Sequence, residues 1–168
     1  MEKKVGIYPG TFDPITYGHF DIVNRSLEIF DTVIVLISEN SNKKTMFTLE
    51  ERKSFIEQSF KDSYVICDNF SGLVKDYVNE RKLLTDSISI IRGLRSNTDF
   101  NYEFQIASLN REIGNVETFF LMCDPQYFYY SSSAFRDLYK LGKDEEYRRL
   151  VPYHIYHDLA ILRGSKVL

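Results

Sequence analysis

The chain has 168 residues, of which 43% are hydrophobic and 15% aromatic, so it can bury a sizeable core and lacks the composition of a disordered protein. Its 21 Lys and Arg residues against 24 Asp and Glu residues give a net charge of −3, which argues against a general nucleic-acid or membrane-surface binder. The apolar runs are too short for a membrane-spanning helix or a signal peptide, and Cys67 and Cys123 have no metal-binding spacing. We therefore expect one cytoplasmic domain over residues 1–168, with buried, reduced thiols and no nucleic-acid or membrane partner.

Five short runs rich in β-branched residues predict strands at residues 5–8, 32–37, 64–67, 88–91 and 118–122. Helical patterns fill the gaps between them. One apolar stripe predicts a helix that begins near Gly18: Phe20, Val23, Leu27 and Phe30. The segment "TLEE" offers Thr48 and Glu51 as a capping box for the next helix. Further helices are expected from about residue 72, around residues 100–107, at 131–141 and at 153–162.

This alternation of strands and helices predicts the fold class. Two of the runs, "VIVLI" and "ISII", are continuously apolar, which is typical of strands buried on both faces of a parallel sheet. We expect a Rossmann-like, doubly wound α/β domain with a five-stranded parallel sheet and helices on both faces. Ligands bind at the carboxyl ends of the strands in such sheets, so the segments that follow the strands are the candidate site.

The first such segment, "GIYPGTFDPITYGH", is rich in glycine and proline. Glycines allow a close approach of the backbone to a ligand, and the helix that begins near Gly18 directs free N–H groups toward it. His19 is then expected in the first helical turn, beside a bound phosphate. The alternative, that His19 only packs or caps the helix, stays open on spacing alone.

Cationic residues follow two more strands. Lys43 and Lys44 come after the second strand, where a solvated surface is the alternative to ligand binding. Arg92 and Arg95 come at the end of the fourth strand, and their guanidinium groups suit phosphate recognition. The alternative is ion pairing with Asp99 or Glu103, which we expect for one of the two arginines rather than for both.

The segment after the fifth strand, "DPQYFYYSSSAFR", leads into a helix. N-capping needs only one serine, whereas three serines followed by Arg136 favour an anion site. Phosphate-suited groups therefore follow four of the five strands, and we expect the first loop to form one wall of a nucleotide site. In the segment "HIYH", His154 and His157 could be read as a metal pair, but without further ligands we favour a helix surface or a subunit contact.

The chain also resembles a known family. Thr16, Tyr17, Gly18 and His19 match the T/H-x-G-H motif of the nucleotidylyltransferase superfamily, and the blocks "PGTFDPIT", "MFTLEER", "IRGLR" and "SSS" occur in the order and spacing of bacterial phosphopantetheine adenylyltransferases. The similarity runs from about residue 4 to residue 162. It implies a Rossmann-like fold, a homohexamer, the use of Mg²⁺ with ATP, adenylyl transfer from ATP to 4′-phosphopantetheine to give dephospho-coenzyme A, and feedback by coenzyme A.

The resemblance also implies site residues. His19, Lys43 and Arg92 would be catalytic, with His19 stabilising the transition state. The 4′-phosphopantetheine would be bound by Thr11, Lys43, Val74 and Arg92. The ATP would be bound by Thr11, Phe12, His19, Gly93, Leu94, Arg95, Glu103, Tyr127, Phe128, Tyr129, Tyr130, Ser131, Ser132 and Ser133. No metal ligand is assigned, because we expect ATP phosphates and water to supply most of the Mg²⁺ ligands.

The chain departs from the family pattern in three places. Tyr17 stands where the family often has Asn, Thr45 where Pro is frequent, and residues 123–130 differ from the common versions of that segment. These departures concern adenine packing and the loop wall rather than the phosphate ligands. Two rival functions stay open: another nucleotidylyltransferase, acting on nicotinate mononucleotide or on a cytidylyl donor, and a non-enzymatic domain that binds a nucleotide or coenzyme A.

Overall fold

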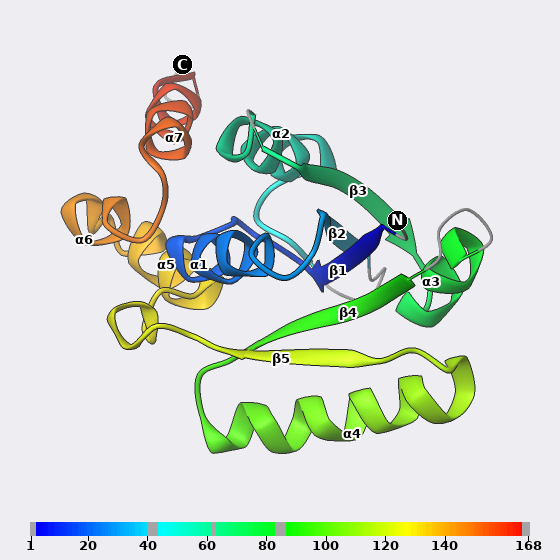
Figure 1. Ribbon diagram of the computed structural model, residues 1–168. Helices are drawn as coiled ribbons and strands as arrows, with labels where there is room; N and C mark the ends of the chain where they lie inside the picture. The colour runs from blue at the N-terminus through cyan, green and yellow to red at the C-terminus, as the bar shows by residue number, and fades with distance from the viewer. Residues whose placement is uncertain (1–2, 40–43, 62, 83–86, 166–168) are drawn as a thin grey trace.

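The computed structural model describes residues 3–39, 44–61, 63–82 and 87–165. Its centre is one parallel sheet made of β1 (Lys4–Gly10), β2 (Thr32–Glu39), β3 (Val65–Ser71), β4 (Ser87–Leu94) and β5 (Thr118–Met122). The strands lie side by side in the order β3-β2-β1-β4-β5 (Figure 1), and each neighbouring pair is parallel. The five predicted parallel strands are thus confirmed. The chain changes direction across the sheet between β1 and β4, which is where ligands bind in open α/β sheets.

The helices are α1 (Tyr17–Ser26), α2 (Leu49–Ser59), α3 (Val74–Lys82), α4 (Asn97–Gly114), α5 (Ser132–Lys140), α6 (Asp144–Arg148) and α7 (Tyr153–Ser165), with a 3₁₀ turn, η1, at Pro125–Tyr127. The capping box predicted for α2 is present: Thr48 Oγ1 accepts from the N–H of Glu51 at 3.2 Å, and Glu51 Oε2 accepts from the N–H of Thr48 at 2.8 Å. The sequence did not predict η1 or α6.

Helices pack on both faces of the sheet, as expected. Alternate side chains of β2 supply the two cores: Val33, Val35 and Ile37 join the larger core, which α1, α2, α5, α6 and α7 cover. Leu36 belongs to the second core, which contains Tyr77 and Val78 of α3. In Figure 1, α4 runs along β4 and β5. The fold class is therefore the predicted one.

Two predicted details are wrong. The stripe through Phe30 was assigned to one helix, but α1 ends at Ser26, and Phe30 reaches the core from the turn that follows. The third strand continues to Ser71, four residues beyond the predicted end, because its polar second half pairs with β2 at the edge of the sheet. An edge strand needs no continuous apolar run.

The C-terminal helix α7 packs against α2. His154 Nε2 lies 3.0 Å from the Ser59 hydroxyl, and His157 Nδ1 lies 3.8 Å from Asp158. In the described part of the chain no cluster of three or more His, Cys, Asp or Glu residues could hold a metal ion, so this pair has no further ligands there. None of the described helices is long and apolar enough to cross a membrane.

Candidate active site

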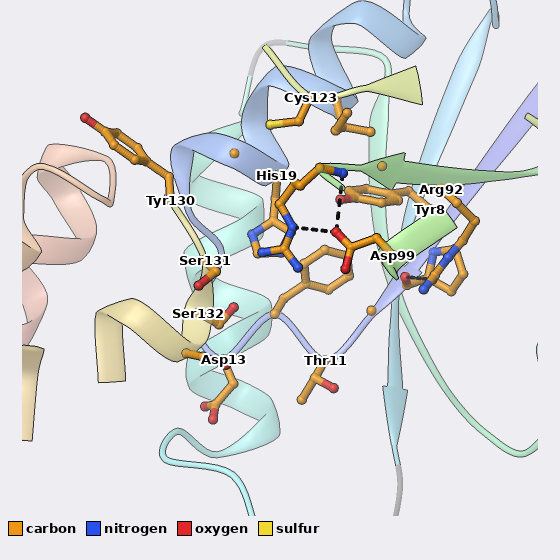
Figure 2. A pocket seen from close by; sticks show the side chains of 18 of the residues that line it. Tyr8, Thr11, Asp13, His19, Arg92, Asp99, Cys123, Tyr130, Ser131 and Ser132 are labelled. Atoms are coloured by element: carbon orange, nitrogen blue, oxygen red, sulfur yellow. Dashed lines mark hydrogen bonds and ion pairs between the residues drawn. The ribbon is translucent and has the colours of Figure 1, made fainter. Parts of the chain in front are cut away.

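A cavity of about 470 Å³ opens at the carboxyl ends of β1, β2, β4 and β5 (Figure 2). This is the edge of the sheet at which a ligand was expected. The cavity brings together eleven of the predicted site residues: Thr11, Phe12, His19, Arg92, Gly93, Arg95, Glu103, Tyr130, Ser131, Ser132 and Ser133. The eleven residues come from the ends of β1, β4 and β5, so their convergence depends on the sheet order and not on sequence proximity.

The loop after β1 is held by guanidinium groups. Arg92 Nη1 donates to the Pro9 carbonyl at 2.8 Å, and the buried Arg52 of α2 donates from Nη1 to the Thr11 carbonyl at 2.8 Å. Phe12, between these contacts and α1, has a φ of 48°, a conformation uncommon for a residue with a side chain. Its ring is buried and meets the His19 ring edge-on with centroids 5.2 Å apart. The loop is therefore fixed in a conformation that supports His19.

The orientation of His19 follows from its contacts with Thr16. The Thr16 N–H donates to His19 Nδ1 at 3.0 Å, while the Thr16 hydroxyl, 2.9 Å from Nδ1, donates to the Tyr130 carbonyl at 2.7 Å. Nδ1 is therefore an acceptor, and the neutral ring carries its proton on Nε2. Among the described residues, Nε2 has no hydrogen-bond partner, so this N–H is available to a ligand.

Burial, together with the positive charges of Arg95 and Arg92, lowers the pKa of His19 to about 4. His19 is consequently neutral at pH 7 and acts as an N–H donor rather than as a cation. A preorganised donor of this kind stabilises charge that develops on a reacting group.

Gly18, the residue before His19, stands at a position where a side chain would not fit. A Cβ atom at this position would lie 2.7 Å from the Tyr130 carbonyl oxygen. The start of α1 and the segment before α5 pack backbone to backbone here, and the Thr16 hydroxyl joins the same carbonyl. Gly18 thus allows the start of α1 and the segment around Tyr130 to come into contact beside His19.

The two arginines of the fourth strand end are both paired with carboxylates. Arg92 binds Glu103 through two nitrogens, with Nε 2.6 Å from Oε2, and Arg95 Nε lies 3.1 Å from Asp99 Oδ2. Burial works to lower the pKa of Arg92, but the hydrogen bond and charge of Glu103 raise it above its ordinary value. The expectation that only one arginine would be paired is wrong, because α4 presents acidic residues one turn apart, at positions 99 and 103, on the side facing β4.

The serines at the start of α5 have distinct contacts. Ser131 is the N-cap and accepts from the Ala134 N–H at 3.1 Å. Ser132 donates to the Pro14 carbonyl at 2.9 Å. Ser133 accepts from Arg136 Nη2 at 3.2 Å. One serine suffices for the cap, as expected, and the other two join α5 to the first loop and to Arg136.

Other predicted site residues do not line the cavity. Leu94 is a buried core residue, Tyr129 is 85% exposed, and Tyr127 and Phe128 lie in the turn before α5, outside the cavity lining. Val74 begins α3 and packs against the second core. Their assignments to ligands stay predictions. Lys43 lies outside the described residues, whereas Lys44 lines the cavity.

The lining residues that the sequence reasoning did not assign to a ligand include Tyr8, Asp13, Lys44, Asp99 and Cys123. Cys123 directly follows the fifth strand, and the strand-end rule could have found it. Burial raises its pKa, so it is an uncharged thiol there. Tyr8 lies within β1. Asp99 was considered only as an ion-pair partner of the arginines, and Asp13 is identified by partners that are distant in sequence.

Two of the departures from the family pattern fall at the cavity and its rim. Tyr17 lies outside the lining, and its ring stacks on Tyr127 with centroids 6.4 Å apart. Thr45 lines the cavity, and its hydroxyl donates to the Phe47 carbonyl at 2.9 Å. Among the described residues, neither side chain forms a hydrogen bond with Arg92, Arg95 or His19.

The carboxylates of the cavity determine what metal chemistry it could support. Asp13, Asp99 and Glu103 line it, but each already accepts hydrogen bonds from the protein. Mg²⁺ usually keeps several waters and binds through substrate phosphates and one or two carboxylates. The site therefore suits an Mg²⁺ ion that enters with a nucleotide and does not form an all-protein metal cage.

Known proteins resemble the chain over most of its length. A sequence profile of the Cytidylyltransferase-like family matches residues 7–138. A phosphopantetheine adenylyltransferase from Clostridium perfringens is 46% identical, covering 96% of this chain and 99% of the relative. Another from Alkaliphilus metalliredigens is 50% identical over 84% of this chain and 88% of the relative. This chain belongs to the phosphopantetheine adenylyltransferase family.

Solved structures with lower identity support the fold of this adenylyltransferase family member. A nicotinic acid mononucleotide adenylyltransferase from Plasmodium falciparum, complexed with NaAD, has a TM-score of 0.69 at 14% identity, covering 92% of this chain and 93% of that one. TmcAL from Thermotoga maritima, bound with alpha-thio ATP, has a TM-score of 0.68 at 12% identity, covering 97% of this chain and 56% of that one. At such identities the likeness concerns the fold alone.

Proposed function

We propose that this chain transfers the adenylyl group of ATP to 4′-phosphopantetheine, giving dephospho-coenzyme A and pyrophosphate. The relatives' name supplies the acceptor. The observation that carries the reaction is the convergence of the His19 Nε2–H with Arg92 and Arg95 in one cavity. Such a site suits two polyanions that must be held together while charge develops between them.

In the proposed step an oxygen of the 4′-phosphopantetheine phosphate attacks the α-phosphorus of ATP. A new P–O bond forms, and the bond from the α-phosphorus to the bridging oxygen breaks. That oxygen keeps the electron pair and leaves as part of pyrophosphate. The attacking phosphate is already anionic at pH 7, since its second pKa is about 6, so the step needs no general base. The absence of a catalytic triad from the proposed roles fits this chemistry.

The proposed roles divide the cavity between the substrates. His19, Lys43 and Arg92 stabilise the transition state. Thr11, Lys43, Val74 and Arg92 bind 4′-phosphopantetheine. Thr11, Phe12, His19, Gly93, Leu94, Arg95, Glu103, Tyr127, Phe128, Tyr129, Tyr130, Ser131, Ser132 and Ser133 bind ATP. Asp99, which accepts from Arg95 Nε at 3.1 Å, is not an ATP ligand in this proposal but the carboxylate with which the ATP phosphates compete for Arg95.

We propose Mg-ATP as the form of the nucleotide substrate. Mg²⁺ reduces the negative charge of the polyphosphate, and Asp99 and Glu103, which line the cavity, are its candidate protein contacts. A reaction that consumes ATP and a coenzyme A precursor belongs in the cytoplasm, and we propose that location. The proposal also includes a single domain over residues 1–168 and feedback inhibition by coenzyme A.

The homohexamer implied by the resemblance is part of the proposal too. An apolar surface on α4 supports it: Phe100, Phe104, Leu109 and Ile113 are 43–55% exposed, and exposed apolar patches mark interaction sites. Light scattering of the purified protein is expected to give six times the mass of one chain, and Leu109→Asp is expected to give a smaller assembly. A monomer at micromolar concentration would contradict this part.

The reaction is tested by product identification. The purified protein is incubated with Mg-ATP and 4′-phosphopantetheine, and mass spectrometry follows the acceptor. The proposal predicts the mass of dephospho-coenzyme A and an equal amount of pyrophosphate. Hydrolysis of ATP without a change in the acceptor would contradict it.

A further inference from the structure

The strongest feature outside the roles above is a buried carboxylate, Asp13, in the loop after β1. It is 2% exposed and has no role in the phosphate chemistry described so far. Its Oδ1 accepts from the Phe47 N–H at 2.9 Å, and its Oδ2 accepts from the Met46 N–H at 2.9 Å. These two amides belong to the segment between β2 and α2. Asp13 therefore fastens the loop of the first strand to the loop of the second.

Asp13 is fastened on its other side to α5. Arg136 Nη1 lies 3.5 Å from the Asp13 carboxylate and donates to the Asp13 carbonyl at 2.9 Å. Arg136 Nη2 donates to Ser133 Oγ at 3.2 Å. The guanidinium thus spans the distance between the first loop and the first turn of α5.

These contacts form one chain of hydrogen bonds across the floor of the cavity. At one end is Met46, two residues after Lys44. Lys44 lines the cavity and directly follows Lys43 in the sequence, which is assigned to 4′-phosphopantetheine. At the other end is Ser133, on the side assigned to ATP. In Figure 2 Asp13 lies next to Ser132 and Thr11.

We propose that Asp13 is a positioning residue that sets the two substrate walls of the cavity at the distance the transfer requires; the inference rests on the proposed function. Asp13 contacts no substrate in this role. It acts through the backbone of residues 46–47 and through Arg136. In a reaction between two bound phosphates, rate depends on the placement of attacking oxygen and phosphorus, and a misplacement of 1 Å can cost about 10²-fold.

The variant Asp13→Asn tests this role, because the amide keeps one acceptor oxygen but loses the charge that faces Arg136. We expect kcat to fall roughly 10-fold or more. The dissociation constants of ATP alone and of 4′-phosphopantetheine alone, measured by calorimetry, are expected to stay within about threefold, because each wall keeps its own ligand groups. A merely structural role would lower Tm without this split between turnover and binding.

Asp68→Asn is the matched control. Like Asp13, Asp68 faces an arginine: it accepts from the Tyr77 hydroxyl at 2.7 Å and from Arg81, but it does not line the cavity. We expect it to lose thermal stability and keep kcat. If Asp13→Asn does not fold, Arg136→Lys is the second variant: it keeps the charge but cannot donate at once to the carboxylate, the carbonyl and Ser133. It should show the same split.

Three results would overturn the inference. These are wild-type kcat in a folded Asp13→Asn or Arg136→Lys variant, a loss confined to the affinity for one substrate, and an equal loss of kcat in Asp68→Asn. An inactive wild-type protein would instead overturn the proposed function, so the two failures are distinguishable.

Discussion

His19 Nδ1 accepts a hydrogen bond from the backbone N–H of Thr16, three residues before it, at 3.0 Å. This contact decides the chemistry of the ring. It fixes the proton on Nε2. Among the described residues, this nitrogen has no hydrogen-bond partner. The same Thr16 directs its hydroxyl to the Tyr130 carbonyl, so the segment that orients His19 also joins the wall that carries the serines.

The first prediction concerns turnover. His19→Ala is expected to lower kcat by about 10²–10³-fold, which is the usual cost of removing a donor that stabilises developing charge. The fold should persist, because the neighbouring Phe12 and Ile22 remain in the core. Steady-state kinetics and the melting temperature check this together. Unchanged kcat in a folded variant would contradict the role of His19.

A second prediction concerns the protonation of His19. A pKa of about 4 means that the imidazole stays neutral from pH 8 down to about pH 5, with the proton on Nε2. Nitrogen-detected NMR of the ¹⁵N-labelled protein checks both points, and the His19→Gln spectrum assigns the signal. A midpoint near 6.5, or a proton on Nδ1, would be inconsistent with the geometry.

The same depressed pKa has a consequence for stability. Between pH 6.5 and about pH 4 the unfolded chain protonates this histidine while the folded chain does not, so the contribution of His19 to the free energy of unfolding falls as the pH falls. Urea titrations at pH 7 and pH 5 should therefore show a smaller loss in His19→Gln than in the wild type. Equal losses in the two proteins would count against the low pKa.

The fourth prediction uses the Arg95–Asp99 ion pair. Triphosphate must compete with Asp99 for Arg95, and a pair with 44% and 30% exposed side chains is worth about 0.2–1 kcal/mol. Asp99→Asn is therefore expected to tighten ATP binding by up to about fivefold, as calorimetry would measure. Weaker binding would indicate that Asp99 orients Arg95 rather than competing for it.

The fifth prediction separates the two lysines after β2. Lys43→Ala is expected to impair the use of 4′-phosphopantetheine and largely keep ATP binding, and Lys44→Ala is the neighbouring control with the smaller effect. The apparent KM for each substrate distinguishes them. A loss of ATP affinity with normal phosphopantetheine use in Lys43→Ala would contradict the assignment.

The strands of the sheet were predicted well because a parallel strand buried on both faces has a continuous apolar sequence, as in residues 33–37. The sequence analysis missed α6, which has five residues and is anchored by one buried side chain, Tyr147, too few for a helical period. It also ended the first helix too late, because Phe30 continues the apolar spacing although the backbone has left the helix.

The residues of the site were predictable from the sequence, but most of their contacts were not. Strand ends and the T-x-G-H segment led to His19, Arg92 and the serines, since topology brings carboxyl ends together. That both arginines are paired depends on how α4 faces β4, although Asp99 and Glu103 are close in sequence. The contacts of Asp13 with residues 46–47 and with Arg136 span up to 123 residues of sequence separation, and no local pattern predicts them.

The central claim is tested most directly by pyrophosphate release from Mg-ATP with one acceptor at a time: 4′-phosphopantetheine, nicotinamide mononucleotide or glycerol 3-phosphate. The account predicts release with 4′-phosphopantetheine alone, and its loss in His19→Ala. Release with nicotinamide mononucleotide or glycerol 3-phosphate instead would contradict the proposed acceptor, and no release with any acceptor would contradict the proposed enzyme activity.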